Sequence, residues 1–150
     1  MLGKQRLDGA LDRFAVTVAG RRVYDLGAST GGFTDCVLQR GAASVVAIDV
    51  GYGQMHERLR RDPRVEVHER TNVRHLRPGA MGEPADVLVA DLSFISLRTV
   101  LPAILPLARS GADLVALVKP QFEAGREEAA RGKGVITDPV VWRRVLEEVA

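Results

Sequence analysis

The sequence has very little cysteine and no long hydrophobic run. Its 150 residues include a single cysteine, Cys36, and one thiol excludes a disulfide framework within the chain. No window approaches the ~18 consecutive apolar residues that a membrane span requires. The first six residues are polar overall and contain no apolar signal region. We therefore expect a cytoplasmic protein that does not span a membrane.

An excess of charge of one sign is also nearly absent. Lys and Arg number 21 against 19 Asp and Glu, which gives a net charge of +2 and a pI near 9.0. This small excess permits a nucleic-acid partner but does not demand one. The composition, 46% hydrophobic and 27% charged, excludes a disordered chain. The length is sufficient for one compact domain with a hydrophobic core.

Short runs rich in Val, Leu and Ile recur along the chain. They predict five strands, at residues 23–26, 44–50, 65–68, 86–92 and 113–118. The last two runs are almost continuously hydrophobic, as in parallel strands that are buried on both faces. Segments with helical patterns follow the first, second and fourth strands, at residues 32–40, 54–61 and 99–109. This alternation predicts an α/β fold with a doubly wound, mostly parallel sheet.

The C-terminal part of the sequence is less regular. The third helical segment contains Pro102 and Pro106, so we expect it to be kinked or entered late. Residues 120–137 contain glycines at 125, 132 and 134 and predict a long functional loop. Asp138 is a good N-cap and Pro139 suits a first helical position, so the pattern predicts a last helix over residues 140–149.

The first predicted strand runs into a glycine-rich loop. Ligands of this fold bind at the carboxyl ends of the strands. The spacing is G-x-x-x-G-G, whereas a dinucleotide fingerprint is G-x-G-x-x-G, with its second glycine making room for a pyrophosphate. A nucleoside without a pyrophosphate, such as S-adenosylmethionine, fits better. A purely structural turn is the alternative. The predicted cofactor-binding residues of the loop are Gly27, Ala28, Ser29, Thr30, Gly31 and Gly32.

Polar residues follow the second and third predicted strands. Asp49 lies about 20 residues beyond the glycine loop, where an acid can accept hydrogen bonds from a ribose diol; a solvated acid at a strand end is the alternative. We include the next residue, Val50, in the predicted cofactor site. Thr71 and Asn72 follow the third strand, near the expected adenine. The Asn72 amide could read the edge of the base, and capping a short helix explains it equally well.

Asp91 ends the fourth predicted strand and Lys119 ends the fifth. Both therefore fall at the same edge of the sheet as the glycine loop. Desolvation offsets the attraction in a buried ion pair, so this placement favours a functional role over a salt bridge that closes the sheet. A partly desolvated lysine can accept the proton of a hydroxyl nucleophile. Asp91 would then fix the direction of the lysine.

Five segments together carry a family resemblance: residues 25–36, 49–54, 69–72, 91–97 and 118–126. In them the sequence resembles the TlyA-type hemolysin and ribosomal RNA methyltransferase family, within the FtsJ-like 2′-O-methyltransferases. The resemblance implies a Rossmann-like methyltransferase fold and S-adenosylmethionine as the cofactor. It also implies 2′-O-methylation of ribose, in cytidine, in ribosomal RNA or ribosomal subunits.

The resemblance further implies a catalytic tetrad of lysine, aspartate, lysine and glutamate. Asp91 and Lys119 match its middle members, and Arg6 stands where the first lysine is expected, with Lys4 nearby. Arginine keeps the charge but cannot act as a base. The final glutamate would lie beyond Ala150. We thus expect residues 1–150 to form an FtsJ-like domain that is incomplete at its C-terminus, lacks the last strands and has no preceding RNA-binding domain.

The remaining expectations concern assembly, RNA contacts and alternative functions. Without the last strands, residues 114–118 would form an exposed apolar sheet edge and favour a homodimer, and the chain would bind cofactor but methylate poorly. Arg126, Arg131 and Lys133 are predicted to contact RNA phosphates, with a solvated charged loop as the alternative.

No metal site and no membrane partner are predicted. Two other functions remain as alternatives: a cofactor-binding RNA-interaction module without catalysis, and a membrane-acting hemolysin, which nothing in the sequence supports.

Overall fold

A six-stranded sheet forms the centre of the molecule. The computed structural model describes residues 2–92, 97–118 and 138–141. The strands are β1 (Arg22–Leu26), β2 (Ser44–Ile48), β3 (Val65–His68), β4 (Ala85–Ala90), β5 (Ala108–Val118) and β6 (Asp138–Val141). Their order in the sheet is β3-β2-β1-β4-β5-β6. Strands β1 to β5 are parallel and β6 is antiparallel to β5, which confirms the predicted doubly wound, mostly parallel sheet.

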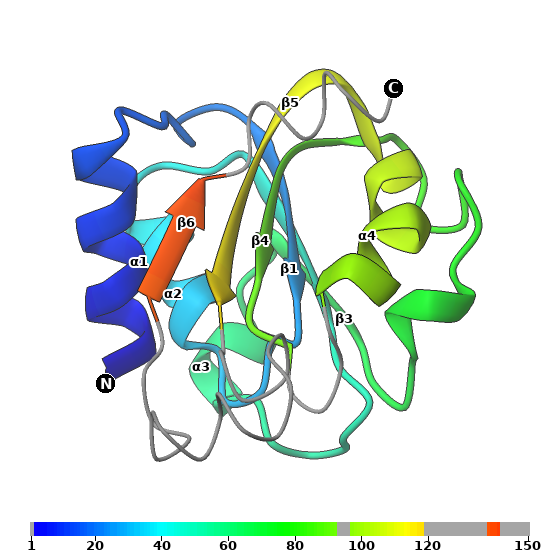
Figure 1. Cartoon of the computed structure of the whole chain (residues 1–150). Coiled ribbons are helices and arrows are strands. Elements are labelled where there is room, and N and C mark those ends of the chain that lie inside the picture. The colour runs from blue at the N-terminus through cyan, green and yellow to red at the C-terminus, as the bar shows by residue number, and fades with distance from the viewer. Residues whose placement is uncertain (1, 93–96, 119–137, 142–150) are drawn as a thin grey trace, which may run out of the picture.

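Helices cover both faces of this sheet (Figure 1). They are α1 (Leu2–Arg13), α2 (Gly32–Gln39), α3 (Glu57–Arg60) and α4 (Leu97–Ile104), with 3-10 turns η1 (Val73–His75) and η2 (Leu105–Leu107). Side chains of α1, α2 and α3 share one hydrophobic cluster with the sheet, and those of α4, η1 and η2 share a second cluster. Each described connection between parallel strands thus returns the chain to the same edge of the sheet, where the next strand begins. The carboxyl ends of the parallel strands therefore lie together at the opposite edge.

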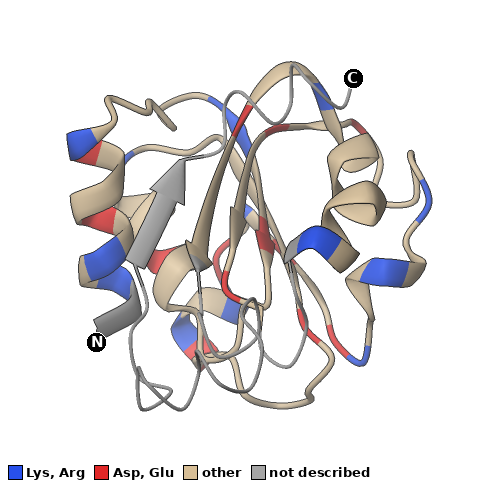
Figure 2. Cartoon of the chain, viewed as in Figure 1, with Lys and Arg blue, Asp and Glu red and all other residues tan. Residues whose placement is uncertain are grey.

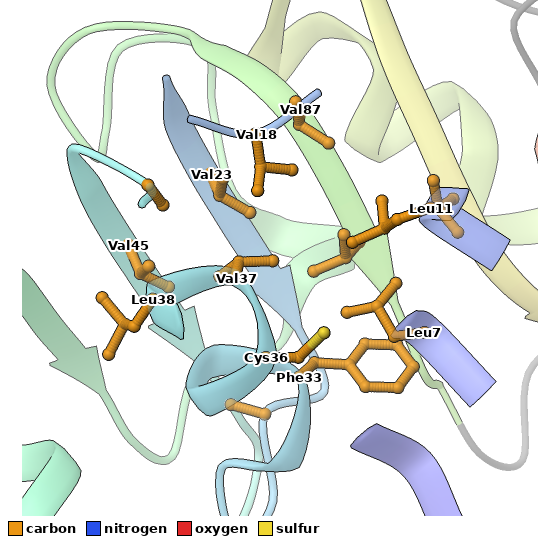
Figure 3. Packing of buried hydrophobic residues seen from close by; sticks show 14 of the residues in the cluster. Leu7, Leu11, Val18, Val23, Phe33, Cys36, Val37, Leu38, Val45 and Val87 are labelled. Atoms are coloured by element: carbon orange, nitrogen blue, oxygen red, sulfur yellow. The ribbon is translucent and has the colours of Figure 1, made fainter. Parts of the chain in front are cut away.

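Alternating side chains of each strand supply the two clusters. On β1, Val23 packs toward α1 and α2, whereas Tyr24 and Leu26 pack toward α4. Figure 3 shows the first cluster, where Leu7 and Leu11 of α1 approach the sheet beside side chains of α2. Two buried faces explain why these strands read as continuous hydrophobic runs rather than as alternating patterns.

The five predicted strands all exist, with some different ends. The second and fourth end two residues early, at Ile48 and Ala90, which places Asp49 and Asp91 in the loops beyond them. The predicted helix over 99–109 is broken: α4 contains Pro102 and gives way to η2, which has a proline in its first turn. The predicted helix over 54–61 is shortened to α3, which His56 caps by accepting a hydrogen bond from the backbone of Arg58.

The predicted last helix is wrong at its start, because Asp138–Val141 forms strand β6. Pro139 pairs with Leu117 in the register with β5. Proline lacks a donor and is tolerated on an edge strand, and the two following valines favour extended backbone. Residues 142–149, the rest of that prediction, lie outside the described residues. Because β6 pairs with β5, the predicted exposed edge at residues 114–118 is also wrong, and the expected homodimer loses its basis.

Helix α1 was not among the predicted elements. Leu7, Ala10 and Leu11 recur at helical spacing and are buried against the sheet. The helix lies beside β6 and α2 (Figure 1). The same helix contains Arg6, which stands where the family resemblance places the first lysine, so one segment contributes both to the core and to the expected tetrad.

Candidate functional site

The glycine loop connects β1 to α2 at the carboxyl edge of the sheet. Gly27 and Ala28 both donate backbone hydrogen bonds to the carbonyl of Ile48, at 2.8 and 3.0 Å, which fastens the loop to β2. Gly27, Ser29 and Gly31 have positive φ angles of 83°, 51° and 105°. Glycine adopts such angles at little cost, so the glycines are required by the turn itself.

Gly27 also permits a close approach between two loops. A Cβ atom built on Gly27 would lie 2.3 Å from the carbonyl oxygen of Asp91. The backbone of Asp91 in turn donates a hydrogen bond to the carbonyl of Leu26 at 3.0 Å. The loops after β1 and β4 are therefore in direct contact, and Asp91 lies beside the glycine loop as predicted from the strand ends.

Asp49 connects the glycine loop to the loop after β2. Its Oδ2 accepts a hydrogen bond from the backbone of Ser29 at 2.5 Å, and its Oδ1 accepts one from the backbone of Gly51 at 2.8 Å. The Asp49 backbone carbonyl accepts a third, from Thr71 at 2.9 Å. A carboxylate has about four lone-pair directions, so this half-buried side chain keeps acceptor capacity for a ligand.

A small recess opens beside Asp49. It is open to solvent, and its lining residues are Ala28, Ser29, Ala47, Asp49, Gly51, Gln54, Met55, Val67 and Glu69. Aliphatic side chains form one part of the lining, and the carboxylates of Asp49 and Glu69 form another. Apolar walls with a few polar groups are typical of small-molecule sites.

Asp25 lies behind the glycine loop and is fully buried. Its Oδ2 accepts a hydrogen bond from the Thr34 hydroxyl at 2.6 Å, and its Oδ1 has no partner among the described residues. Burial raises the pKa of the Asp25 carboxyl to about 7, against the lowering effect of Thr34; the neighbouring carboxylates of Asp91 and Asp49 add to the rise. An incompletely satisfied acid at a ligand edge marks a candidate functional residue.

Some of the predicted cofactor residues line the recess, and others lie outside it. Ala28, Ser29 and Asp49 line the recess, whereas Val50 is exposed beside it. Thr71 and Asn72 have structural partners: the Thr71 hydroxyl donates to the backbone carbonyl of Glu69, and the side-chain Oδ1 of Asn72 accepts from the backbone N–H of Arg74. Asn72 therefore caps η1, the second of the two roles considered for it, and its contact with an adenine stays a prediction.

The other glycine-loop residues shape the turn. Thr30 accepts a backbone hydrogen bond from His56 at 3.0 Å. Gly31 lies against α3, since a Cβ there would approach Leu59 to 2.3 Å, and Gly32 begins α2. These contacts bring α3 to the rim of the recess and place Met55 in its wall.

Six residues that line the recess were not predicted as site residues: Ala47, Gly51, Gln54, Met55, Val67 and Glu69. Glu69 follows β3 at the same edge as Asp49, so the end of the third strand was the available signal. Its carboxylate pairs with Arg60 at 2.5 Å and accepts the backbone N–H of Gly53. That hydrogen bond, followed by Arg60, lowers the pKa of Glu69.

Lys119 and the predicted RNA contacts Arg126, Arg131 and Lys133 lie outside the described residues, so their placement stays a prediction. Arg6 is half-buried on α1. Lys4, the nearby alternative to Arg6, bonds to Asp35 of α2 at 2.9 Å.

The fold defines a domain of the Rossmann-like methyltransferase class. Residues 5–150 match the model of the FtsJ-like methyltransferase family, and the chain belongs to that family. It is 58% identical over 148 residues to the 16S/23S rRNA (cytidine-2′-O)-methyltransferase TlyA of Mycobacterium tuberculosis (strain CDC 1551 / Oshkosh), covering 99% of this chain and 55% of that protein. The chain spans about half the length of the curated relatives it matches.

Solved structures agree with this assignment. A protein from Streptococcus thermophilus that carries a hemolysin name superposes with a TM-score of 0.81 at 47% identity, over 83% of this chain and 46% of that one. An S-adenosylmethionine-dependent methyltransferase from Mesorhizobium loti superposes at 0.61 and 19% identity, over 74% and 52%, which supports the fold alone. Within the described part of the chain, no helix has the length and apolar character needed to cross a membrane.

Proposed function

We propose that this chain catalyses S-adenosylmethionine-dependent 2′-O-methylation of ribose in ribosomal RNA, at a cytidine. The observation that supports this most is the recess beside the glycine loop, with Asp49 on its wall. The M. tuberculosis relative is named for the same reaction. Ribosomal RNA as the substrate would place the chain with ribosomes in the cytoplasm.

The residues present fit S-adenosylmethionine. The aliphatic wall of Ala47, Met55 and Val67 suits a purine base, and the remaining lone pairs of Asp49 suit the ribose hydroxyls. Neither Asp49 nor Asp25 forms an ion pair within the described residues. Carboxylates gathered at this edge favour a ligand with cationic groups, and S-adenosylmethionine has a sulfonium and an ammonium group. When bound, it supplies an electrophilic methyl group.

The chain's own residues then have two tasks, to position the ribose and to remove its proton. A ribose hydroxyl is a weak nucleophile, so a base or a charged orienting group is needed. We assign proton removal to Lys119: its amine takes the proton of the 2′-hydroxyl as the oxygen–methyl bond forms and the sulfur–methyl bond breaks. Asp91 holds the lysine in line with that oxygen, and Arg6 adds positive charge nearby.

Single-turnover transfer of a tritiated methyl group tests this proposal, with the chain in excess over ribosomal subunits or naked ribosomal RNA. We expect Lys119→Ala and Asp91→Asn to lower the rate by about 10²–10⁴-fold, the usual cost of losing a general base, while S-adenosylhomocysteine affinity changes little. Arg61→Ala, at an exposed pair with Glu57, is the matched control and should leave the rate unchanged.

The chemistry of the product gives a second readout. A methyl group on the 2′-oxygen blocks alkaline cleavage of the next phosphodiester bond, so label should remain in alkali-resistant dinucleotides. Label released in mononucleotides would place the methyl group on a base and contradict the proposal. Cofactor binding with no transfer to either substrate would favour the RNA-interaction module instead.

A further inference from the structure

An exposed aromatic ring belongs to the loop that contributes Gly51 and Gln54 to the recess. Among the described residues, the exposed large hydrophobic side chains are Phe14, Val50 and Tyr52, at 41%, 69% and 68% exposure. Two of the three belong to the loop between β2 and α3, which also contributes to the recess. A single exposed hydrophobic residue is ordinary, so the contacts of Tyr52 decide whether this one has a role.

The Tyr52 ring is held in place by Arg70. The guanidinium carbon of Arg70 lies 4.4 Å from the centroid of the ring. Arg70 has a φ of +50°, and its backbone donates a hydrogen bond to the carbonyl of Gly51 at 3.0 Å. The neighbouring backbone N–H of Gly53 donates to the Glu69 carboxylate. The backbone here is strained and held by hydrogen bonds, and it presents the stacked side chains of Tyr52 and Arg70 to solvent. Such a surface is preorganised.

The chain segment that begins at Arg70 carries positive charge. Residues 70–79 contain Arg70, Arg74 and Arg77 and no acidic residue, and all three arginines are exposed. None of them forms an ion pair within the described residues. Figure 2 shows basic residues on η1 and at the start of the neighbouring α4. The closest acid along the chain, Glu69, is already paired with Arg60.

We propose that Tyr52 and Arg70 form a stacking platform for an unpaired base of single-stranded RNA, next to the nucleotide whose ribose is methylated; this rests on the proposed function. Every base has a π-face that can stack on an aromatic ring or a guanidinium plane. Arg74 and Arg77 extend the platform with positive charge for the phosphates. A paired base in a duplex is already stacked on its neighbours, so the platform favours unpaired RNA.

Fluorescence anisotropy with the full 150-residue chain tests the platform, using a labelled single-stranded RNA oligonucleotide and a duplex of the same length. Tyr52→Ala should weaken single-strand binding by about 5- to 150-fold, which corresponds to the usual ~1–3 kcal/mol for one stacked base. Tyr52→Phe should retain the affinity, because it keeps the ring. Arg70→Gln should weaken single-strand binding as well.

Phe14→Ala is the matched control. Phe14 is also exposed and has a neighbouring arginine, Arg13, at 5.7 Å from its ring. It follows α1 and precedes the start of β1, at the opposite edge of the sheet from the recess. Its removal should leave RNA binding unchanged.

Three results would overturn the platform: single-strand affinity that does not respond to Tyr52→Ala, an equal loss for the duplex, or no RNA binding by the wild-type chain. A loss of S-adenosylhomocysteine affinity in Tyr52→Ala, matching the loss of RNA affinity, would assign the ring to the cofactor and would also overturn it. If single-strand binding depends on Tyr52 but no methyl group is transferred, the proposed function fails while the platform stands.

Discussion

At the scale of single residues, Asp25 has the most unusual environment in the described part of the chain. Its carboxyl is fully buried at the end of β1, one of its oxygens bonds to Thr34, and two further carboxylates lie near it. Desolvation disfavours the charged form of an acid. Without a cationic ligand, this acid is therefore partly protonated near neutral pH, where an ordinary aspartate is ionised.

Asp25 should make the folded state less stable as pH rises. Its pKa is raised from 3.8 to about 7 in the folded protein, so the stabilisation is fully present below pH 4 and is lost as pH rises through 7. At about 1.4 kcal/mol per pH unit, the loss is on the order of 4 kcal/mol. Urea unfolding of wild type and Asp25→Asn between pH 4 and 8 measures it. Parallel pH profiles for the two proteins would show that Asp25 ionises normally.

At the scale of elements, an ion pair joins α1 to α2, which lie on the same face of the sheet. Lys4 of α1 bonds to Asp35 of α2 at 2.9 Å, and Asp35 is 4% exposed. Burial favours a raised pKa for Asp35, but the hydrogen bond and charge of Lys4 outweigh it, so the pKa is lowered. Arg58 adds a longer contact of 3.4 Å from a mostly exposed side chain.

Removing the lysine should therefore destabilise the chain. Lys4→Met leaves a buried carboxylate with weaker partners, and we expect a loss of about 1–3 kcal/mol at pH 7. A lowered pKa means that the stabilisation is present above pH 4 and disappears as Asp35 is protonated in acid. Arg61→Met, which breaks the exposed pair with Glu57, should cost less than about 0.5 kcal/mol. Equal effects of the two substitutions in urea unfolding would contradict this account.

The elements also show what local sequence can predict. Short runs rich in β-branched residues, such as Val87–Ala90, favour strands; all five predicted strands were found, and the strand ends placed Asp49 and Asp91 correctly at one edge. Strand β6 was missed because its pairing with Leu117 is a long-range contact, while Asp138 and Pro139 locally favour a helix start. Gln54 and Glu69 were missed because only the packing of β2 beside β3 brings their loops together.

At the scale of the whole molecule, the net charge of +2 conceals an uneven distribution. Many acidic residues are committed to contacts within the fold, for example Asp8 and Asp12 with Arg40 and Asp86 with Arg109. The arginines at 74 and 77 have no such ion pairs in the described region. The overall balance therefore understates the positive charge that this region presents to an anionic polymer.

Binding of single-stranded RNA should accordingly weaken as salt rises. Each neutralised phosphate contributes about 0.7 to the slope of log affinity against log salt. The double substitution Arg74→Gln with Arg77→Gln removes two cations. For each phosphate contact that is lost, the slope should become smaller by about 0.7. Neutralising Arg126, Arg131 and Lys133 should reduce it again. A slope unchanged by either set would make that set a solvated surface rather than an RNA-binding one.

The central claim is that the carboxyl edge of β1, β2 and β4 binds a nucleoside without a pyrophosphate. Calorimetric titration of the chain with S-adenosylhomocysteine and with NAD tests it most directly, using Asp49→Asn and the exposed-acid control Glu66→Gln. We predict that S-adenosylhomocysteine binds and NAD does not, and that Asp49→Asn weakens binding by about 1–3 kcal/mol while Glu66→Gln leaves it unchanged. Binding of NAD, or S-adenosylhomocysteine affinity that is the same in wild type and Asp49→Asn, would contradict the claim.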